Sequence, residues 1–110
     1  MPSEADRQAW GEIAIHAALA HRWAAEVEAA VFAADPMRYH ATVRCLEIVS
    51  EAARRLSPDE RSADLPWRAI MDSGNAYRHA YHQITPTRVR YTAIADLPAL
   101  IAAAEAALAP

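Results

Sequence analysis

Apolar and small side chains recur every three or four residues over roughly the first third of the chain. This spacing keeps them on one face of an α-helix, and their positions are Trp10, Ile13, Ala17, Ala20, Ala24, Val27 and Val31. The pattern predicts one long amphipathic helix from about Glu4 to Ala34, roughly 45 Å long at 1.5 Å per residue. Only two glycines interrupt a chain whose 54% hydrophobic content rests heavily on alanine, so helix is favoured throughout.

Prolines that follow a capping residue predict where later helices begin. Asp35 before Pro36 opens a second helix that runs to about Leu56, and Thr85 before Pro86 opens the last one. The apolar face of the second helix is predicted to hold Val43, Leu46, Val49, Ala53 and Leu56.

Two shorter signals complete the expected order of elements. Ser57 and Glu60 have the spacing of a capping box and predict one short turn. A third helix is expected over about 66–82, and Pro98 is expected to kink or restart the last helix.

Four main helices with short connections predict an all-α fold, an antiparallel bundle of four to five helices. At 110 residues the chain is expected to form a single domain, 1–110. The long first helix, together with Trp23, Phe32 and Trp67, gives more apolar surface than so small a bundle is expected to cover. The sequence therefore predicts a homodimer that forms through the long helices.

Charge and cysteine content narrow the class of protein. A net charge of -3 means that no overall basic field attracts nucleic acid, although a local basic site is compatible with it. Cys45 is the single cysteine, and it is expected to be a small buried apolar side chain. The N-terminus is charged and no unbroken apolar run nears the ~18 residues of a membrane span, so we expect a cytoplasmic protein without a membrane segment.

Two stretches and one motif carry a resemblance to a known family. The stretches are Leu46–Ser57 and Leu65–Ile70, and the motif is Asn75, three residues, His79, one residue and Tyr81. This chain resembles the HepT-like branch of the HEPN family over about 37–108. That family's active-site pattern begins with an arginine directly before the asparagine, and Gly74 stands at that position here.

The resemblance implies a fold and a function. HepT-like proteins are small, all-helical and often dimeric, and many are ribonuclease toxins encoded beside a minimal nucleotidyltransferase that acts as antitoxin. It implies a metal-independent endoribonuclease that needs no cofactor and cleaves RNA such as tRNA or mRNA, with His79 as acid or base and Asn75 positioning the phosphate. It also implies that the partner adds AMP to Tyr81, and that Glu51 orients the histidine or binds the arginine. The family normally has a glycine before that glutamate, and Ser50 takes its place here.

The chemistry of such a site requires a cation as well as a histidine. Histidine suits proton transfer near neutral pH, and arginine stabilises the charge that grows on a phosphate. Several arginines could replace the one missing at position 74. Arg78 points about 100° away from its neighbour His79 and shares a face with His82. The others are Arg68, Arg88 and Arg90, or an arginine from a dimer partner.

Other readings of the same residues stay open. The chain could be a catalytically inactive binding module that docks the nucleotidyltransferase as its partner or substrate-binding subunit. Gly74 could mark a close backbone contact, a bend or a decayed site. His79 and His82 are three apart but have no second pair of ligands, so no metal site is predicted. Arg54 and Arg55 are a solvated helix end or a phosphate contact, and Tyr77 pairs with Tyr81 as plain aromatics.

Overall fold

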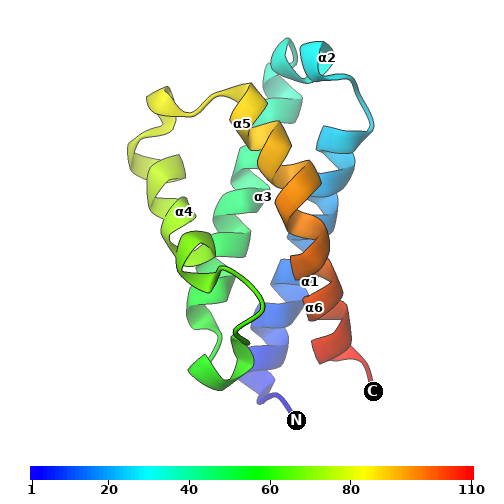
Figure 1. Cartoon of the computed structure of the whole chain (residues 1–110), viewed down its shortest axis with the longest axis vertical. Coiled ribbons are helices and arrows are strands. Elements are labelled where there is room, and N and C mark those ends of the chain that lie inside the picture. Colours follow the sequence, from blue (N-terminus) through cyan, green and yellow to red (C-terminus); the bar gives the residue numbers. More distant parts are fainter.

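The helices run alternately up and down beside one another, and Figure 1 shows this antiparallel order. A computed structural model describes the backbone of residues 1–110 and every side chain except that of Tyr81. The long elements are α1 (Glu4–Ala25), α3 (Pro36–Arg55), α4 (Trp67–His79), and a continuous run of α5 (Pro86–Tyr91), the π-helical η3 (Thr92–Asp96) and α6 (Leu97–Leu108). The short ones are α2 (Ala29–Ala33), η1 (Pro58–Glu60) and η2 (Tyr81–Gln83). The predicted all-α, antiparallel bundle is confirmed.

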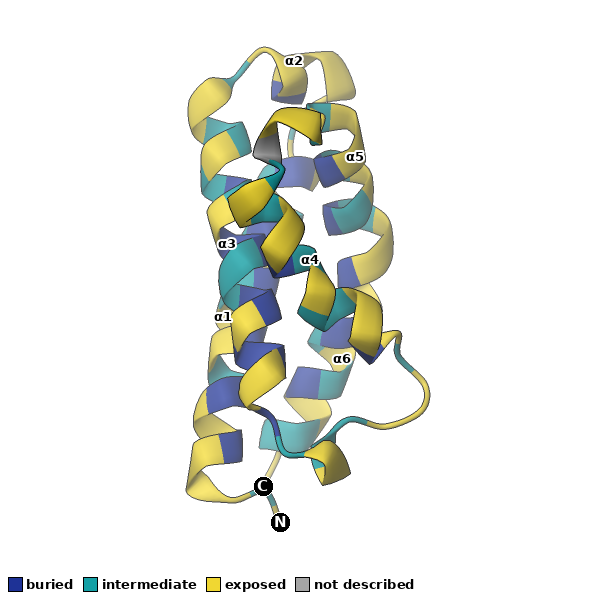
Figure 2. Ribbon diagram, turned by 90° about the vertical axis from the view of Figure 1, so that its left-hand side faces the viewer, coloured by how far each residue is buried: buried dark blue, intermediate teal, exposed yellow. Residues whose placement is uncertain are grey.

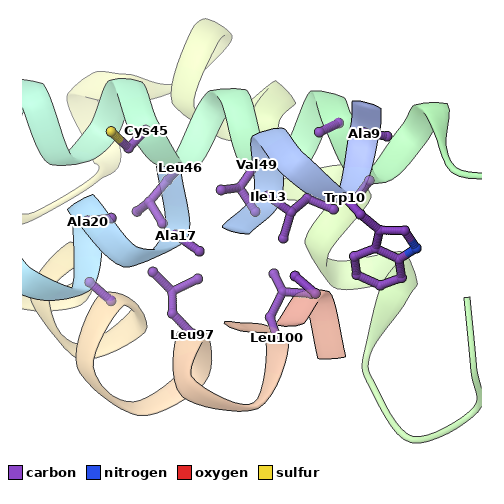
Figure 3. Packing of buried hydrophobic residues seen from close by; sticks show 14 of the residues in the cluster. Ala9, Trp10, Ile13, Ala17, Ala20, Cys45, Leu46, Val49, Leu97 and Leu100 are labelled. Atoms are coloured by element: carbon purple, nitrogen blue, oxygen red, sulfur yellow. The ribbon is translucent and has the colours of Figure 1, made fainter. Parts of the chain in front are cut away.

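The core lies where α1 packs against α3 and α6, with α4 on the other side of α3. Ile13, Leu46 and Leu100 meet there, as Figure 3 shows, and all three are buried. The small residues of α1 let neighbouring helices approach closely, because Ala17 and Ala20 are wholly buried. Cys45 is buried, as its surroundings in the sequence predict.

The first helix ends earlier than the apolar stripe predicts. α1 stops at Ala25, and Phe32 on α2 is fully buried while Val31 is 50% exposed. Arginines from two later helices bind carbonyl groups around the end of α1. Arg38 Nη1 donates to Trp23 O at 2.9 Å, and Arg90 donates to Ala24 O at 3.2 Å and to Val27 O at 3.0 Å. These bonds satisfy carbonyls that a longer helix would have paired internally.

This early end removes one reason to expect a homodimer. A helix of 22 residues is about 33 Å long, which the rest of the bundle matches. Trp67 and Phe32 are both buried within one chain, and Trp67 packs edge-on against Trp10 at 5.8 Å between ring centres. Two of the three large aromatic groups are therefore covered without a second copy, and the third, Trp23, is partly buried.

The predicted helix starts at Asp35 and Thr85 are confirmed. Asp35 Oδ1 accepts a hydrogen bond from Arg38 N at 3.0 Å, and Thr85 Oγ1 accepts one from Arg88 N at 3.2 Å. In both cases the proline that follows occupies the first turn.

The capping box predicted at Ser57 is wrong, although the short turn it opens is present as η1. The Ser57 backbone N–H and hydroxyl donate to the Asp6 carboxylate at 2.9 and 2.8 Å. Glu60 Oε1 accepts from Trp10 Nε1 at 2.8 Å. The two polar side chains thus tie η1 to α1 instead of capping it.

The third helix ends earlier than the sequence predicts, and the last helix restarts near Pro98. α4 ends at His79, because the next residues turn the chain so that Ile84 O accepts a hydrogen bond from the Tyr39 hydroxyl at 3.4 Å. The last helix follows the prediction at Pro98: after the π-helical η3, α6 begins at Leu97 with Pro98 in its first turn, which is the predicted restart. A proline has no N–H for the preceding turn, and a π-helical turn is one way to accommodate that loss.

The sequence has no unbroken apolar run long enough to span a membrane, but the last helix taken as a whole is apolar enough to do so. Pro86–Leu108 spans 23 residues with a mean hydropathy of 1.3, enough to cross a membrane by length and composition alone. The core helix of a soluble protein passes the same test, and this one buries Val89, Ala93, Leu97, Leu100 and Ala104. It is weak evidence for a membrane span.

Candidate functional site

Asn75 and His79 lie one turn apart on α4, and both are exposed. Figure 2 shows that much of the outer face of α4 is exposed, whereas Trp67 and Gly74 are its buried residues. The histidine and the asparagine of the motif therefore share a surface that a large substrate can reach.

Gly74 lies on the opposite, buried side of this turn, against α3. Its N–H donates to Ser50 Oγ at 3.0 Å, and the Ser50 hydroxyl donates to Met71 O at 3.0 Å. A Cβ atom at position 74 would lie 2.7 Å from Ser50 Oγ and 3.1 Å from Ser50 Cβ, which is too close. Of the three readings of Gly74, the close contact is therefore the one that the packing supports.

Arg78 turns back along α4 toward the preceding turn. Its Nη2 donates to Asn75 Oδ1 at 3.0 Å. Its Nη1 lies 3.3 Å from the place that a Cβ at position 74 would occupy. The structure thus brings Arg78 to Asn75, a contact that the 100° rotation from His79 did not predict. The i,i+3 spacing of these two polar side chains is the signal in the sequence that points to it.

A polar cavity of about 400 Å³ opens beside Arg78, between α1, α3 and α4. Glu51 lines it, so two of the predicted supporting residues share one cavity. Charged side chains of both signs complete the wall, with Arg55 paired to Glu12 at 2.7 Å and Arg44 near Glu47 at 3.8 Å. The part contributed by α1, including His16, was not identified from the sequence.

The other arginines considered from the sequence lie elsewhere. Arg68 is exposed in the first turn of α4, about 10 Å along the axis from Asn75 at 1.5 Å per residue. Arg88 faces the Tyr91 ring at 5.7 Å, and Arg90 binds carbonyls at the end of α1. Among the described side chains, Arg78 is the arginine that binds Asn75, and none of these three does.

Arg54 and Arg55 both bind other helices of the bundle. Arg54 Nε donates to Met71 O on α4 at 2.9 Å, and Arg55 pairs with Glu12 on α1. Arg61 closes the same end of α3, where its Nη1 donates to Leu56 O at 2.6 Å. The basic run therefore joins helices as well as meeting solvent.

The predicted modification site, Tyr81, can be placed only by its backbone. It begins η2, two residues after His79, and its side chain lies outside the described residues. Tyr77, its proposed aromatic partner, lines a second and mostly apolar cavity of about 390 Å³ between α4 and α5–α6. Burial raises the pKa of Tyr77 to about 12, so this phenol is neutral at physiological pH.

His79 and His82 do not share a helix, since α4 ends at the first of them. Among the side chains that the structure describes, no group of three or more His, Cys, Asp or Glu is placed to hold a metal ion. The residues of this surface are instead an exposed histidine, an amide and an arginine bonded to that amide. Such groups can transfer a proton and bind an anion.

The helical bundle and this surface agree with a comparison against protein families. The family model described as "Ribonuclease HepT-like" matches residues 13–107. The chain belongs to this HepT-like ribonuclease family, of the HEPN type. No curated protein and no solved structure matches the chain.

Proposed function

We propose that this protein is the toxin of a toxin–antitoxin pair and cleaves RNA in the cytoplasm without a metal or cofactor. The family supports a ribonuclease. The observation that carries the proposal is the exposed surface of Asn75 and His79, with Arg78 hydrogen-bonded to the asparagine.

In the proposed reaction, a ribose 2′-hydroxyl attacks the adjacent phosphorus. A bond forms between the 2′ oxygen and phosphorus, and the bond from phosphorus to the 5′ oxygen of the next nucleotide breaks. His79 accepts the proton from the 2′-hydroxyl or donates one to the departing oxygen, and Asn75 holds a phosphate oxygen. RNA that lacks the 2′-hydroxyl is therefore expected to resist cleavage.

The test is cleavage of tRNA and total RNA in EDTA by the wild-type protein and by His79→Ala. Proton transfer by a positioned histidine contributes roughly 100-fold or more, so we expect a loss of at least that size. His40→Ala is a matched control, because His40 is exposed on α3 and lines neither cavity. Equal cleavage by the wild type and His79→Ala would contradict the proposal.

The second candidate function is a catalytically inactive module that docks a nucleotidyltransferase. Gly74 is the observation that favours it, because the residue expected to carry a cation has no side chain. The same assay separates the two functions. RNA that stays intact with folded wild-type protein would favour the binding module.

We propose that the partner is a minimal nucleotidyltransferase and that it silences the toxin by adding AMP to Tyr81. The phenol oxygen would attack the α-phosphorus of ATP, and pyrophosphate would leave. The position of Tyr81 directly after α4 supports this, because a bound AMP would lie near His79. Mass spectrometry after incubation with the partner and ATP should find AMP on Tyr77→Phe but not on Tyr81→Phe; AMP elsewhere on Tyr81→Phe would refute the assignment.

We also propose a homodimer through the long helices. Ile15 on α1 supports it, because this large apolar side chain is 60% exposed within one chain. Light scattering should give twice the 12.1 kDa of the chain, and a monomer at micromolar concentration would refute it.

A further inference from the structure

Arg78 occupies the region that the missing side chain of position 74 leaves open. The three atoms nearest to a Cβ at that position belong to Ser50 and Arg78, with Arg78 Nη1 at 3.3 Å. The guanidinium reaches this place from one turn later in α4, and its Nη2 holds Asn75 Oδ1 at 3.0 Å. A cation therefore stands beside the motif asparagine although Gly74 carries none.

Ser50 and Gly74 together keep this place open. The Ser50 hydroxyl bonds to Gly74 N and Met71 O, and it stands 2.7 Å from where a Cβ at position 74 would be. A larger residue at 74 would clash with Ser50 and would push the flexible guanidinium of Arg78 aside. A glycine at position 74 thus leaves room for the present position of Arg78.

The charge of Arg78 is available to a ligand. Among the described side chains, no carboxylate lies within ion-pair distance of Arg78. The same cavity holds three carboxylates: Glu12 and Glu47 pair with Arg55 and Arg44, and Glu51 lines it without an ion pair among the described side chains. Its three arginines and three glutamates balance in charge, so the Arg78 charge is not already neutralised by a direct partner. Arg78 itself is exposed, and a guanidinium binds phosphate through two parallel N–H groups.

We propose that Arg78 is the phosphate-binding cation of this site and contacts the backbone of single-stranded RNA in place of a side chain at position 74. The proposal rests on the proposed ribonuclease function for its ligand class. Asn75, bonded to the same guanidinium, fixes the direction in which the fork points. The phosphate then lies beside the turn that holds Gly74 and Asn75, one turn before His79.

The first experiment measures binding of a short 2′-O-methyl RNA, which cannot be cleaved, at several salt concentrations. Arg78→Ala should weaken binding about tenfold, and the slope of log affinity against log salt should fall by about 0.7 for one lost contact to a single strand. Arg78→Lys should keep the slope and recover part of the affinity, because it retains the charge without the fork. Arg7→Ala is the control: Arg7 is exposed at the start of α1, outside both cavities.

The second experiment moves the arginine. The variant combines three substitutions. Ser50→Gly and Arg78→Ala remove the three atoms nearest to a Cβ at position 74, and Gly74→Arg supplies a cation there. This triple variant should regain the affinity and the salt slope that Arg78→Ala alone loses. If the triple variant does not fold, the affinities and salt slopes of Arg78→Ala and Arg78→Lys still show whether Arg78 contacts a phosphate.

The outcomes separate this inference from the ribonuclease proposal. Unchanged affinity and slope in Arg78→Ala, or no RNA binding by the wild type at low salt, would overturn the inference. Cleavage that requires His79 but not Arg78 would overturn it and leave the ribonuclease standing. Binding that requires Arg78 without any cleavage would support it and remove the ribonuclease.

Discussion

Ser50 and Gly74 bind each other across the contact between α3 and α4. The resemblance in the sequence leads one to expect a glycine at position 50 and an arginine at position 74, and this chain has Ser50 and Gly74 there. The two positions therefore hold a complementary pair, in which the side chain on α3 fills space that α4 leaves empty. A decayed site would not require such a match, whereas a packed contact does.

We expect Gly74→Ala to destabilise the protein by about 1–4 kcal/mol. Alanine gains about 1 kcal/mol in helix propensity, but overpacking costs about 1–3 kcal/mol and each lost Ser50 hydrogen bond about 1 kcal/mol. In a Ser50→Gly background the same change should be neutral or stabilising, because the two closest contacts belong to Ser50 and the third, Arg78 Nη1 at 3.3 Å, is the end of a flexible side chain that can move. Chemical denaturation of the four proteins of this cycle measures the effect.

Gly11→Ala is the matched control for that cycle. Gly11 also lies inside a helix, but nothing is within 4 Å of a Cβ built there. It should stabilise the protein by about 0.5–1 kcal/mol. A gain in stability from Gly74→Ala in the presence of Ser50 would show that the contact is not as tight as described.

Sequence spacing locates Asn75 and His79 well, because residues four apart on a helix share a face whatever their side chains do. For Arg78 the spacing gives less. It allows a contact with Asn75, three residues earlier, but an arginine has several rotatable bonds, so the direction of its Cβ does not fix where its guanidinium lies. The structure selects this contact over the face shared with His82.

At the scale of elements, contacts from distant parts of the chain set several helix ends. Arg38 and Arg90 bind carbonyls at the end of α1. At the start of α1, the Ser57 backbone N–H donates to the Asp6 carboxylate. Local signals such as Asp35 before Pro36 predicted the starts correctly, since a cap acts within one turn. The end of α1 could not be predicted in the same way, because its partners lie 15 to 66 residues away in sequence.

The bond between Asp6 and η1 predicts an acid dependence of stability. Hydrogen bonds from the backbone N–H and then the hydroxyl of Ser57 hold the pKa of Asp6 below its ordinary value of 3.8. The charged form of Asp6 is favoured in the folded state. Its contribution to the free energy of unfolding is therefore complete above about pH 4 and is lost as the pH falls through the lowered pKa. Asp6→Asn should lower the thermal midpoint near neutral pH, and its difference from the wild type should shrink below about pH 4.

Asp59→Asn is the control for this measurement, because Asp59 is exposed on η1. It should change the midpoint little at either pH. A difference between Asp6→Asn and the wild type that stays constant down to about pH 3 would mean that the Asp6 charge is not its source.

At the scale of the whole molecule, α4 separates two cavities of different character. The polar one, beside Arg78, faces α1 and α3, and the apolar one, lined by Tyr77, faces α5 and α6. The periodicity of the sequence predicted the bundle that creates both, because each helix must bury one face. It did not predict the cavities, which depend on how far neighbouring helices stand apart.

The proposed ribonuclease function requires RNA to bind on the last turns of α4, at Asn75, Arg78 and His79. The most direct test is nuclear magnetic resonance of the isotope-labelled protein during titration with 2′-O-methyl RNA in EDTA. We expect the largest shifts at the Asn75 side-chain amide, the Arg78 Nε–H and the His79 ring. Shifts that cluster instead at Arg54 and Arg55, with α4 unchanged, would contradict the claim.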